Sequence, residues 1–138
     1  MDYKLELIVI PCENIDTVKE FYTDKAGFRL DVDHRAGEDF RVVQLTPPGS
    51  ACSITLMRNG QKAGSVQGLH LVVTDIEAAR AELSDRGMDI GEIFHFEEGA
   101  QKPGPDPERG NYNSFLTFSD PEGNGWLIQE VSKSPSHH

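Results

Sequence analysis

Two stretches of the chain follow one pattern and decide the fold: LELIVIPCENIDTVKEFYTDKAGFRL at residues 5–30 and GLHLVVTDIEAARAELSDRGMDI at residues 68–90. Each begins with apolar residues typical of a strand and passes through a polar turn into an amphipathic helix. A glycine then ends the helix, and a further strand follows. An internal repeat of this kind indicates two modules built in the same way.

Residues that favour helix ends mark the boundaries of both helices. Asn14 is placed to cap the first helix, and Gly27 is placed to end it. The segment from Thr74 to Glu77 has the spacing of a capping box at the start of the second helix, which Gly87 ends. We therefore expect the helices to end near the two glycines.

The later parts of the two halves also correspond. Residues 40–57 read as two strands around a Pro-Pro-Gly turn, and residues 113–131 as two strands around an Asp-Pro-Glu-Gly-Asn-Gly turn. Each half is therefore a βαβββ module, residues 1–62 and 63–132, in an α+β fold. Because neither module covers its own sheet face, we expect the two to form one structural domain, a curved mixed sheet around a shared cavity.

Composition restricts the partners. The chain has 138 residues and a net charge of −10, which argues against nucleic acid and anionic membranes, since both require clustered Lys and Arg. No apolar run is long enough to span a membrane. The charge favours a cationic or neutral small-molecule ligand.

The ends of the chain and its thiols indicate a cytoplasmic protein. The N-terminus leads directly into strand-like sequence rather than a signal peptide. We therefore interpret Cys12 and Cys52 as reduced thiols, with Cys12 in the core. Residues 133–138 read as a disordered tail, and His137 and His138 are excluded from any metal site.

Four motifs carry a resemblance to a known family. They are Phe21-Tyr22, Val73-Thr74-Asp75-Ile76, Arg86-Gly87 and the turn Ser119-Asp120-Pro121-Glu122-Gly123-Asn124. The sequence resembles the vicinal oxygen chelate superfamily, the group of glyoxalases, bleomycin-resistance proteins and dioxygenases, from about Leu5 to Val131. The resemblance implies a small-molecule site in the shared concavity and a homodimer.

The resemblance also implies four metal-ligand positions, on the first and last strand of each module, where the family's enzymes carry His or Glu. Counting from the helix starts and turns places these positions at Leu7, Ser53, Gly68 and Leu127. These side chains do not make a metal site, so we predict no metal. No phosphate-binding glycine loop is present, so we expect no nucleotide cofactor either.

His70 is the candidate acid–base residue. Because strand side chains alternate, it shares the face of the vacant position at Gly68. The same count gives the predicted floor of the pocket: Leu7, Val9, Ser53, Thr55, Gly68, His70, Leu127 and Gln129. Three interpretations remain open: a catalytic or hydrogen-bonding group, an ordinary histidine satisfied by backbone or water, and a metal ligand together with Glu6 and Glu130 if a β-bulge turns either one inward.

A long segment, residues 93–112, is placed to flank or cover the pocket. Within it, Arg109 and Tyr112 are candidate anchors for an anionic or carbonyl group of a ligand. The alternative is that Arg109 pairs with Asp106 and only holds the loop. We expect His95 on the solvent side of its strand, and Trp126 in the core.

Three functions are compatible with these features. The first is a metal-free binder that sequesters a drug or metabolite. The second is a metal-dependent lyase, isomerase or dioxygenase resembling glyoxalase, in which a metal polarises a substrate oxygen. The third is a metal-free enzyme that uses His70 as its acid or base.

Overall fold

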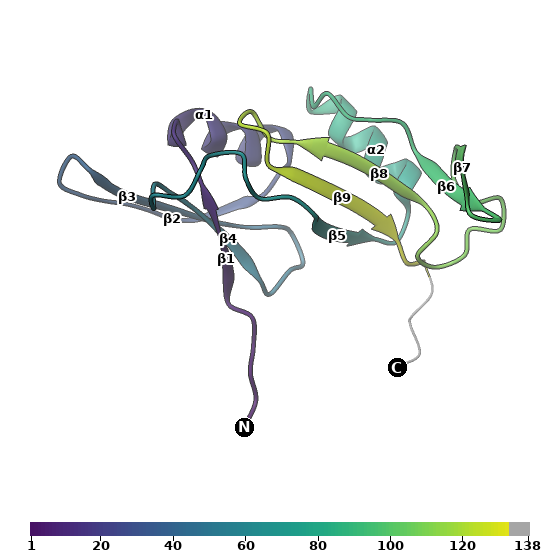
Figure 1. The fold of residues 1–138 in the computed structure, drawn as a ribbon, viewed down its shortest axis with the longest axis horizontal. Coiled ribbons are helices and arrows are strands. Elements are labelled where there is room, and N and C mark those ends of the chain that lie inside the picture. The colour runs from purple at the N-terminus through teal and green to yellow at the C-terminus, as the bar shows by residue number, and fades with distance from the viewer. Residues whose placement is uncertain (133–138) are drawn as a thin grey trace. The chain divides into compact units, whose positions relative to one another are not determined.

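The computed structural model describes residues 1–132, which form two compact units (Figure 1). The first unit comprises Met1–Gln67 and the turn Ser119–Asn124, and the second comprises Gly68–Phe118 and the chain from Gly125 onward. The turn therefore packs on the first unit although it lies in the second repeat. The predicted tail at residues 133–138 lies outside the described residues.

The first unit holds a four-stranded mixed sheet in the order β1-β4-β3-β2, in which β1 is parallel to β4 and the other pairs are antiparallel. Its elements are β1 (Leu7–Pro11), α1 (Ile15–Glu20), the π-helical turn η1 (Phe21–Lys25), β2 (Arg29–Ala36), β3 (Phe40–Thr46) and β4 (Ser53–Met57).

The second unit repeats this plan with one more strand. Its sheet has the order β5-β9-β8-β6-β7, and β5 is parallel to β9. The elements are β5 (Leu69–Val73), α2 (Ile76–Asp85), β6 (Phe94–Glu97), β7 (Ala100–Pro103), β8 (Phe115–Ser119) and β9 (Gly125–Glu130). The α+β class with two mixed sheets is confirmed, and β7 is an addition within the long segment 93–112. None of the helices in residues 1–132 has the length and apolarity needed to cross a membrane.

The predicted helix ends are confirmed with one correction. Asn14 caps α1 by accepting a hydrogen bond from the Thr17 backbone N–H, and Gly27 and Gly87 follow the helices with positive φ values of 73° and 90°. The expected capping box at Thr74 is wrong. The residue that caps α2 is Asp75, whose carboxylate accepts from the backbone N–H groups of the second and third helical residues.

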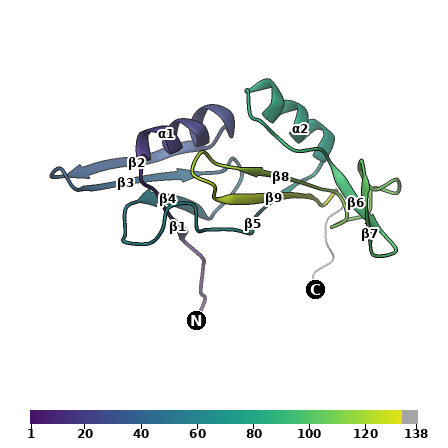
Figure 2. The ribbon, with the colours of Figure 1, turned by 45° about the horizontal axis from the view of Figure 1, so that its top comes forward.

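Each helix lies over one face of its own sheet and buries the apolar residues of that face (Figure 2). In the first unit Ile10, Ile54 and Leu56 are fully or almost fully buried on the helix side. In the second unit Trp126 stacks on Phe118 at a ring-centroid distance of 5.7 Å, so its predicted core position is confirmed.

The thiol of Cys12 belongs to the first core. The side chain is 2% exposed, and burial raises its pKa to about 12. A thiol with this pKa stays protonated near neutral pH, so it is a poor nucleophile. The prediction of a core cysteine is confirmed.

The turn Ser119–Asn124, here called the clip turn, fastens the first unit. The buried Asp120 carboxylate accepts a 2.7 Å hydrogen bond from the Tyr22 hydroxyl and further bonds from the backbone N–H groups of Glu122 and Asn124. The Glu122 carboxylate accepts from the backbone N–H groups of Glu13 and Asn14, where α1 begins. A negative charge at this end of a helix is favourable.

Gly64 lies so close to the clip turn that no side chain fits there. A Cβ at this position would lie 2.2 Å from the Glu122 carbonyl oxygen. Gly60 has nearly the same φ, 84° against 82°, but nothing lies within 4 Å of its Cβ position. The two glycines therefore separate the cost of the backbone conformation from the cost of the contact.

We expect Gly60→Ala to lower the free energy of unfolding by about 1 kcal/mol, since it only forces an L-residue into the left-handed region. Gly64→Ala should lower it by about 3 kcal/mol or more, because the clip turn must also move. Urea denaturation of both variants measures the difference. Equal losses would show that Gly64 does not support the clip turn.

Candidate functional site

Four of the predicted floor residues share one face of the first sheet. Leu7 pairs with Ser53 and Val9 pairs with Thr55, so all four side chains lie on the face opposite the buried Ile10. Leu7 and Val9 are half-buried, while Ser53 and Thr55 are buried. This face combines apolar residues with hydroxyl groups.

A row of hydrogen-bonded polar side chains, here called the hydroxyl row, crosses the same face. It runs from Gln44 through Ser53 and Thr46 to Asp31. The two hydroxyl oxygens are 2.7 Å apart, and the Gln44 amide nitrogen is 3.4 Å from the Ser53 oxygen. The hydrogen bond from Thr46, with the Arg29 guanidinium beside it, lowers the pKa of Asp31.

Sequence reasoning found only Ser53 of the hydroxyl row. The signal for two other members was available, because Gln44 and Thr46 alternate with the buried Val43 and Leu45 along β3. The face on which Asp31 lies does not follow from strand alternation. This residue lies at a break in register between β2 and β3, and a bulge of this kind re-aims a side chain.

His70 and three other predicted floor residues belong to the second unit. His70 pairs with Leu127, and Val72 pairs with Gln129, so these side chains share one face of the second sheet. Gly68 immediately precedes β5 with a φ of 77°. The His70 ring is exposed, and its Nδ1 lies 2.7 Å from the Gly68 carbonyl oxygen. Since a carbonyl only accepts, Nδ1 carries a proton, and Nε2 is left as an acceptor in the neutral ring.

Three phenylalanines form an aromatic cluster on this face. The ring centroids of Phe94, Phe96 and Phe115 are 5.6 to 6.0 Å apart. Phe118 stacks on Trp126 on the helix side, so Phe115, three residues earlier in the strand, points to the opposite side. Phe96 is 42% exposed, which leaves part of the cluster accessible.

The expectation that His95 faces solvent is wrong. Its side chain is buried, with Nδ1 2.7 Å from the Gly104 carbonyl oxygen and Nε2 2.6 Å from the Glu97 carboxylate. A carbonyl and a carboxylate both accept, so these contacts favour a ring with protons on both nitrogens, the imidazolium. The bond to Glu97 and that to Gly104 raise the pKa of His95. His95 does lie on the side opposite Phe94 and Phe96, but the segment after β7 covers that side.

Arg109 is engaged in holding the loop. Its guanidinium donates to both Glu130 oxygens at 3.0 and 2.7 Å, to Glu77 at 2.7 Å and to Asp75 at 3.4 Å. The pairing predicted as the alternative, with the Asp106 carboxylate, is not the one that forms. The guanidinium thus has most of its donors committed within the protein.

The carboxylate that receives Arg109 is the buried Glu130, which also accepts from the Ile76 backbone N–H at the start of α2. Arg109 lowers the pKa of Glu130. The other predicted anchor, Tyr112, is 47% exposed, and its backbone N–H donates to the Glu130 carbonyl. Its φ of 65° lies in the left-handed region.

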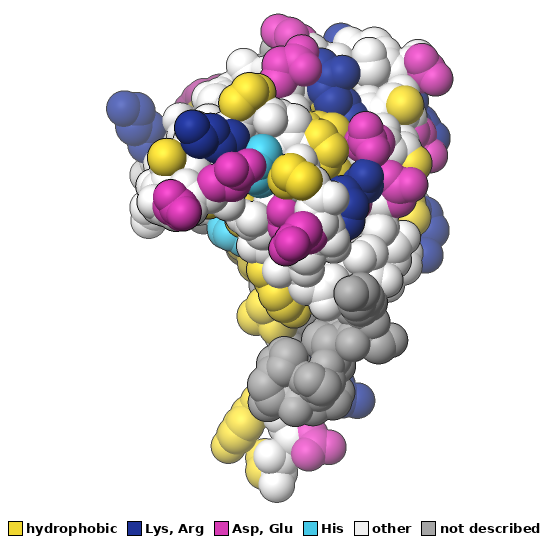
Figure 3. Space-filling model, turned by 90° about the vertical axis from the view of Figure 1, so that its right-hand side faces the viewer, with side chains coloured by type: hydrophobic (Ala, Val, Ile, Leu, Met, Phe, Trp, Pro, Cys, Tyr) yellow, Lys and Arg dark blue, Asp and Glu magenta, His cyan; other side chains and the backbone are white. Residues whose placement is uncertain are grey.

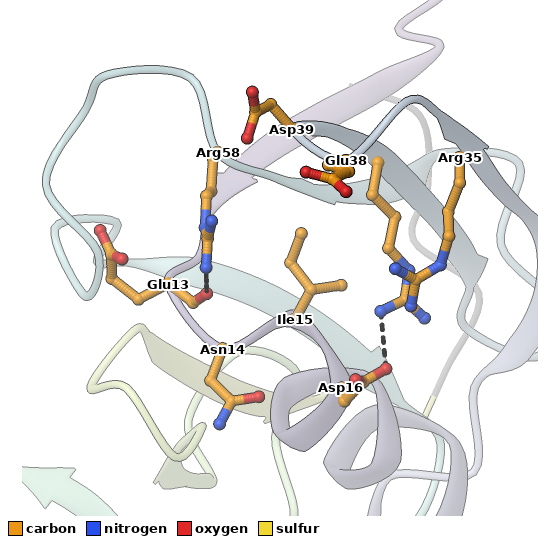
Figure 4. Close-up of a pocket in the computed structure, with 9 residues that line it drawn as sticks. Glu13, Asn14, Ile15, Asp16, Arg35, Glu38, Asp39 and Arg58 are labelled. Carbon is orange, nitrogen blue, oxygen red and sulfur yellow. Dashed lines mark hydrogen bonds and ion pairs between the residues drawn. The ribbon is translucent and has the colours of Figure 1, made fainter.

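A polar hollow of about 360 Å³ lies beside the start of α1 (Figure 4). Two of its arginines have partners: Arg41 contacts the Asp16 carboxylate at 2.6 Å, and Arg58 donates to the backbone carbonyl oxygen of Glu13. The lining residues are Glu13, Asn14, Ile15, Asp16, Arg35, Glu38, Asp39, Arg41 and Arg58. None of these was predicted as a site residue.

The surface seen from the side of β6 and β7 mixes acidic, basic and apolar side chains (Figure 3). The apolar groups visible there are interrupted by charged ones. This side of the molecule therefore shows no broad apolar surface.

Comparison with known proteins establishes the family. Residues 4–128 match the model of the Glyoxalase/Bleomycin resistance protein/Dioxygenase superfamily. The chain belongs to this superfamily.

Three relatives illustrate the range of the superfamily. TnmS3, an antibiotic binding protein from Streptomyces sp. CB03234, is 26% identical with a TM-score of 0.73 over 95% of this chain and 98% of that one. A glyoxalase/bleomycin resistance protein from the same organism is 27% identical, with a TM-score of 0.69 over 92% and 100%. The uncharacterised protein YetH of Bacillus subtilis (strain 168) is 23% identical over 127 residues, 89% of this chain and 94% of YetH.

The residues present do not fit the divalent metal of the superfamily's enzymes. Of the four expected ligand positions, only Ser53 has a polar side chain. Within residues 1–132 there is no group of three or more His, Cys, Asp or Glu that could hold a metal ion. The fallback set of His70, Glu6 and Glu130 fails as well, because His70 and Glu130 lie on opposite faces of the second sheet.

We predict that His95 titrates above its ordinary pKa of 6.5 and that Glu97→Gln lowers this pKa, because the neutral amide no longer favours the imidazolium. The stabilisation from His95 is present below pH 6.5 and is lost as the pH rises through the raised pKa. NMR titration of the ring carbons measures the pKa. Glu98→Gln is the matched control, and titration of His95 at or below 6.5 in the parent protein would exclude the imidazolium.

Proposed function

We propose that this protein binds and sequesters a small, largely apolar molecule without a metal. The observation that carries the proposal is the aromatic cluster of Phe94, Phe96 and Phe115, which lies partly exposed on the face of the second sheet opposite α2. Ligand sites of this kind are mainly apolar and aromatic, with a few polar groups that orient the ligand. Gln129 and the exposed His70 supply polar groups on the same sheet, and Leu127 adds an apolar side chain.

The description of TnmS3 as an antibiotic binding protein supports the same proposal. The net charge of −10 favours a neutral or cationic ligand, since it repels anions. The enzymatic alternatives have less support. Among the described contacts His70 is bonded only to the Gly68 carbonyl, with neither a nucleophile nor an orienting carboxylate at the ring.

We further propose a cytoplasmic homodimer. The free thiols Cys12 and Cys52 are compatible with a reducing compartment. The β2 strand lies at a sheet edge, and Leu30 and Val32 on it are more than 40% exposed. An exposed apolar edge strand is a common site for pairing with another chain.

The proposed binding predicts a difference between two equally exposed phenylalanines. Nile red, a neutral planar dye, should bind the parent protein, and Phe96→Ala should weaken binding about tenfold because an aromatic contact surface is lost. Phe40→Ala is the control, since Phe40 is 45% exposed against 42% for Phe96 but lies outside the cluster. Fluorescence titration gives both dissociation constants, and dialysis against EDTA should leave them unchanged. Equal affinities of the two variants, or dependence on a metal, would contradict the proposal.

The proposed dimer predicts a mass of twice the 15.3 kDa chain in solution. Val32→Lys should shift the protein toward monomer, because it places a charge on the edge strand. Light scattering after size-exclusion chromatography measures the mass. A parent protein that stays at the monomer mass across a wide concentration range would count against a dimer.

A further inference from the structure

We propose that the face of the first sheet recognises a carbonyl oxygen of a small neutral molecule, through the Thr55 hydroxyl assisted by the Gln44 amide. This inference rests on the proposed small-molecule binding and names the chemical group that the face of the first sheet selects. It is carried by two independent observations, the fixed direction of the hydroxyl row and the unpaired hydroxyl of Thr55.

The Asp31 carboxylate at one end of the hydroxyl row fixes which group donates in each hydrogen bond of the row. An ionised Asp31 only accepts, so the Thr46 hydroxyl donates to it. The Thr46 oxygen is then free to accept, and the Ser53 hydroxyl donates to it. The Ser53 oxygen in turn accepts from the Gln44 amide N–H.

This direction determines what the row offers to a ligand. Both hydroxyl protons of the row are used internally, so neither Thr46 nor Ser53 donates outward. The Gln44 amide nitrogen is held as a donor toward Ser53, and its second N–H stays available. The row therefore presents a donor beside Thr55.

Thr55 supplies the second donor. Its side-chain oxygen is buried and has no hydrogen-bond partner among the described residues. A buried hydroxyl without a partner is unfavourable, and native proteins rarely retain one without a reason. Thr55 lies directly between Val9 on β1 and Gln44 on β3, its two register partners.

The surroundings select a neutral acceptor. Neighbouring pairs on one face have their side chains close together, so the Thr55 O–H and the Gln44 N–H can meet one oxygen atom. The flanking Val9 and Leu7 are apolar and favour a ligand with an apolar body. An ammonium group gains little here, because the Asp31 charge is already paired with Arg29 at 2.7 Å. An anion finds no cation among Val9, Thr55 and Gln44.

A matched pair of probes tests this inference. 9-Fluorenone and fluorene are planar and neutral and differ by the carbonyl group. The parent protein should bind fluorenone more tightly than fluorene. Thr55→Val should weaken fluorenone about fivefold, the value of one net hydrogen bond, and leave fluorene within twofold. Thr55→Ser keeps the hydroxyl and should retain the preference, and Thr74→Val, an exposed threonine elsewhere, should change neither probe.

Two further readouts do not depend on affinity. The carbonyl stretch of bound fluorenone should move to higher frequency in Thr55→Val, because a donor is lost. In the ligand-free protein, Thr55→Val should not lower the urea midpoint of unfolding, because the hydroxyl has no partner to lose.

The outcomes separate this inference from the proposed function. If neither probe binds, the proposed function fails and the inference with it. If both probes bind but Thr55→Val affects them equally or not at all, only the carbonyl recognition is overturned. A strongly destabilised Thr55→Val would also overturn it, since the hydroxyl would then have a partner within the protein.

Discussion

The first unit depends on the hydrogen bonds that the buried Asp120 carboxylate accepts. This carboxylate gathers the Tyr22 hydroxyl and two backbone N–H groups of its own turn, and so holds the clip turn against the first helix. With the turn in place, Glu122 supplies the negative charge that α1 needs at its start. The close approach of Gly64 to the Glu122 carbonyl completes the attachment. The Asp-Pro-Glu-Gly-Asn-Gly motif therefore holds the start of α1 in place.

Carboxylates that only accept hydrogen bonds organise other parts of the molecule in the same way. Glu130 accepts from Arg109 and from the first N–H of α2, and so joins the long loop to the start of α2. Glu97 favours the doubly protonated form of His95, and Asp31 sets the direction of the hydroxyl row. In each case a single acidic side chain determines the orientation of its polar neighbours, because it has no proton to donate.

The fold was predictable because its signals are local. The helix stops at Gly27 and Gly87 and the strand alternation depend on residues close together in the sequence. The faces of His70 and Thr55 also follow from alternation. The partners of polar side chains were not predictable, because they lie on segments that are distant in the sequence and meet only in the folded structure. His95 illustrates this: its face was clear, but its burial depends on a loop that returns to it.

The division of the first unit between two distant parts of the chain has a consequence for synthesis on the ribosome. The first helix and its sheet emerge early, but Tyr22 and the start of α1 find Asp120 and Glu122 only after the second helix and most of the second sheet have been made. Until then the start of α1 lacks the Glu122 carboxylate, and the Tyr22 hydroxyl lacks its hydrogen bond to Asp120. Its folding is therefore completed late, together with that of the second unit, and the two repeats do not mature one after the other.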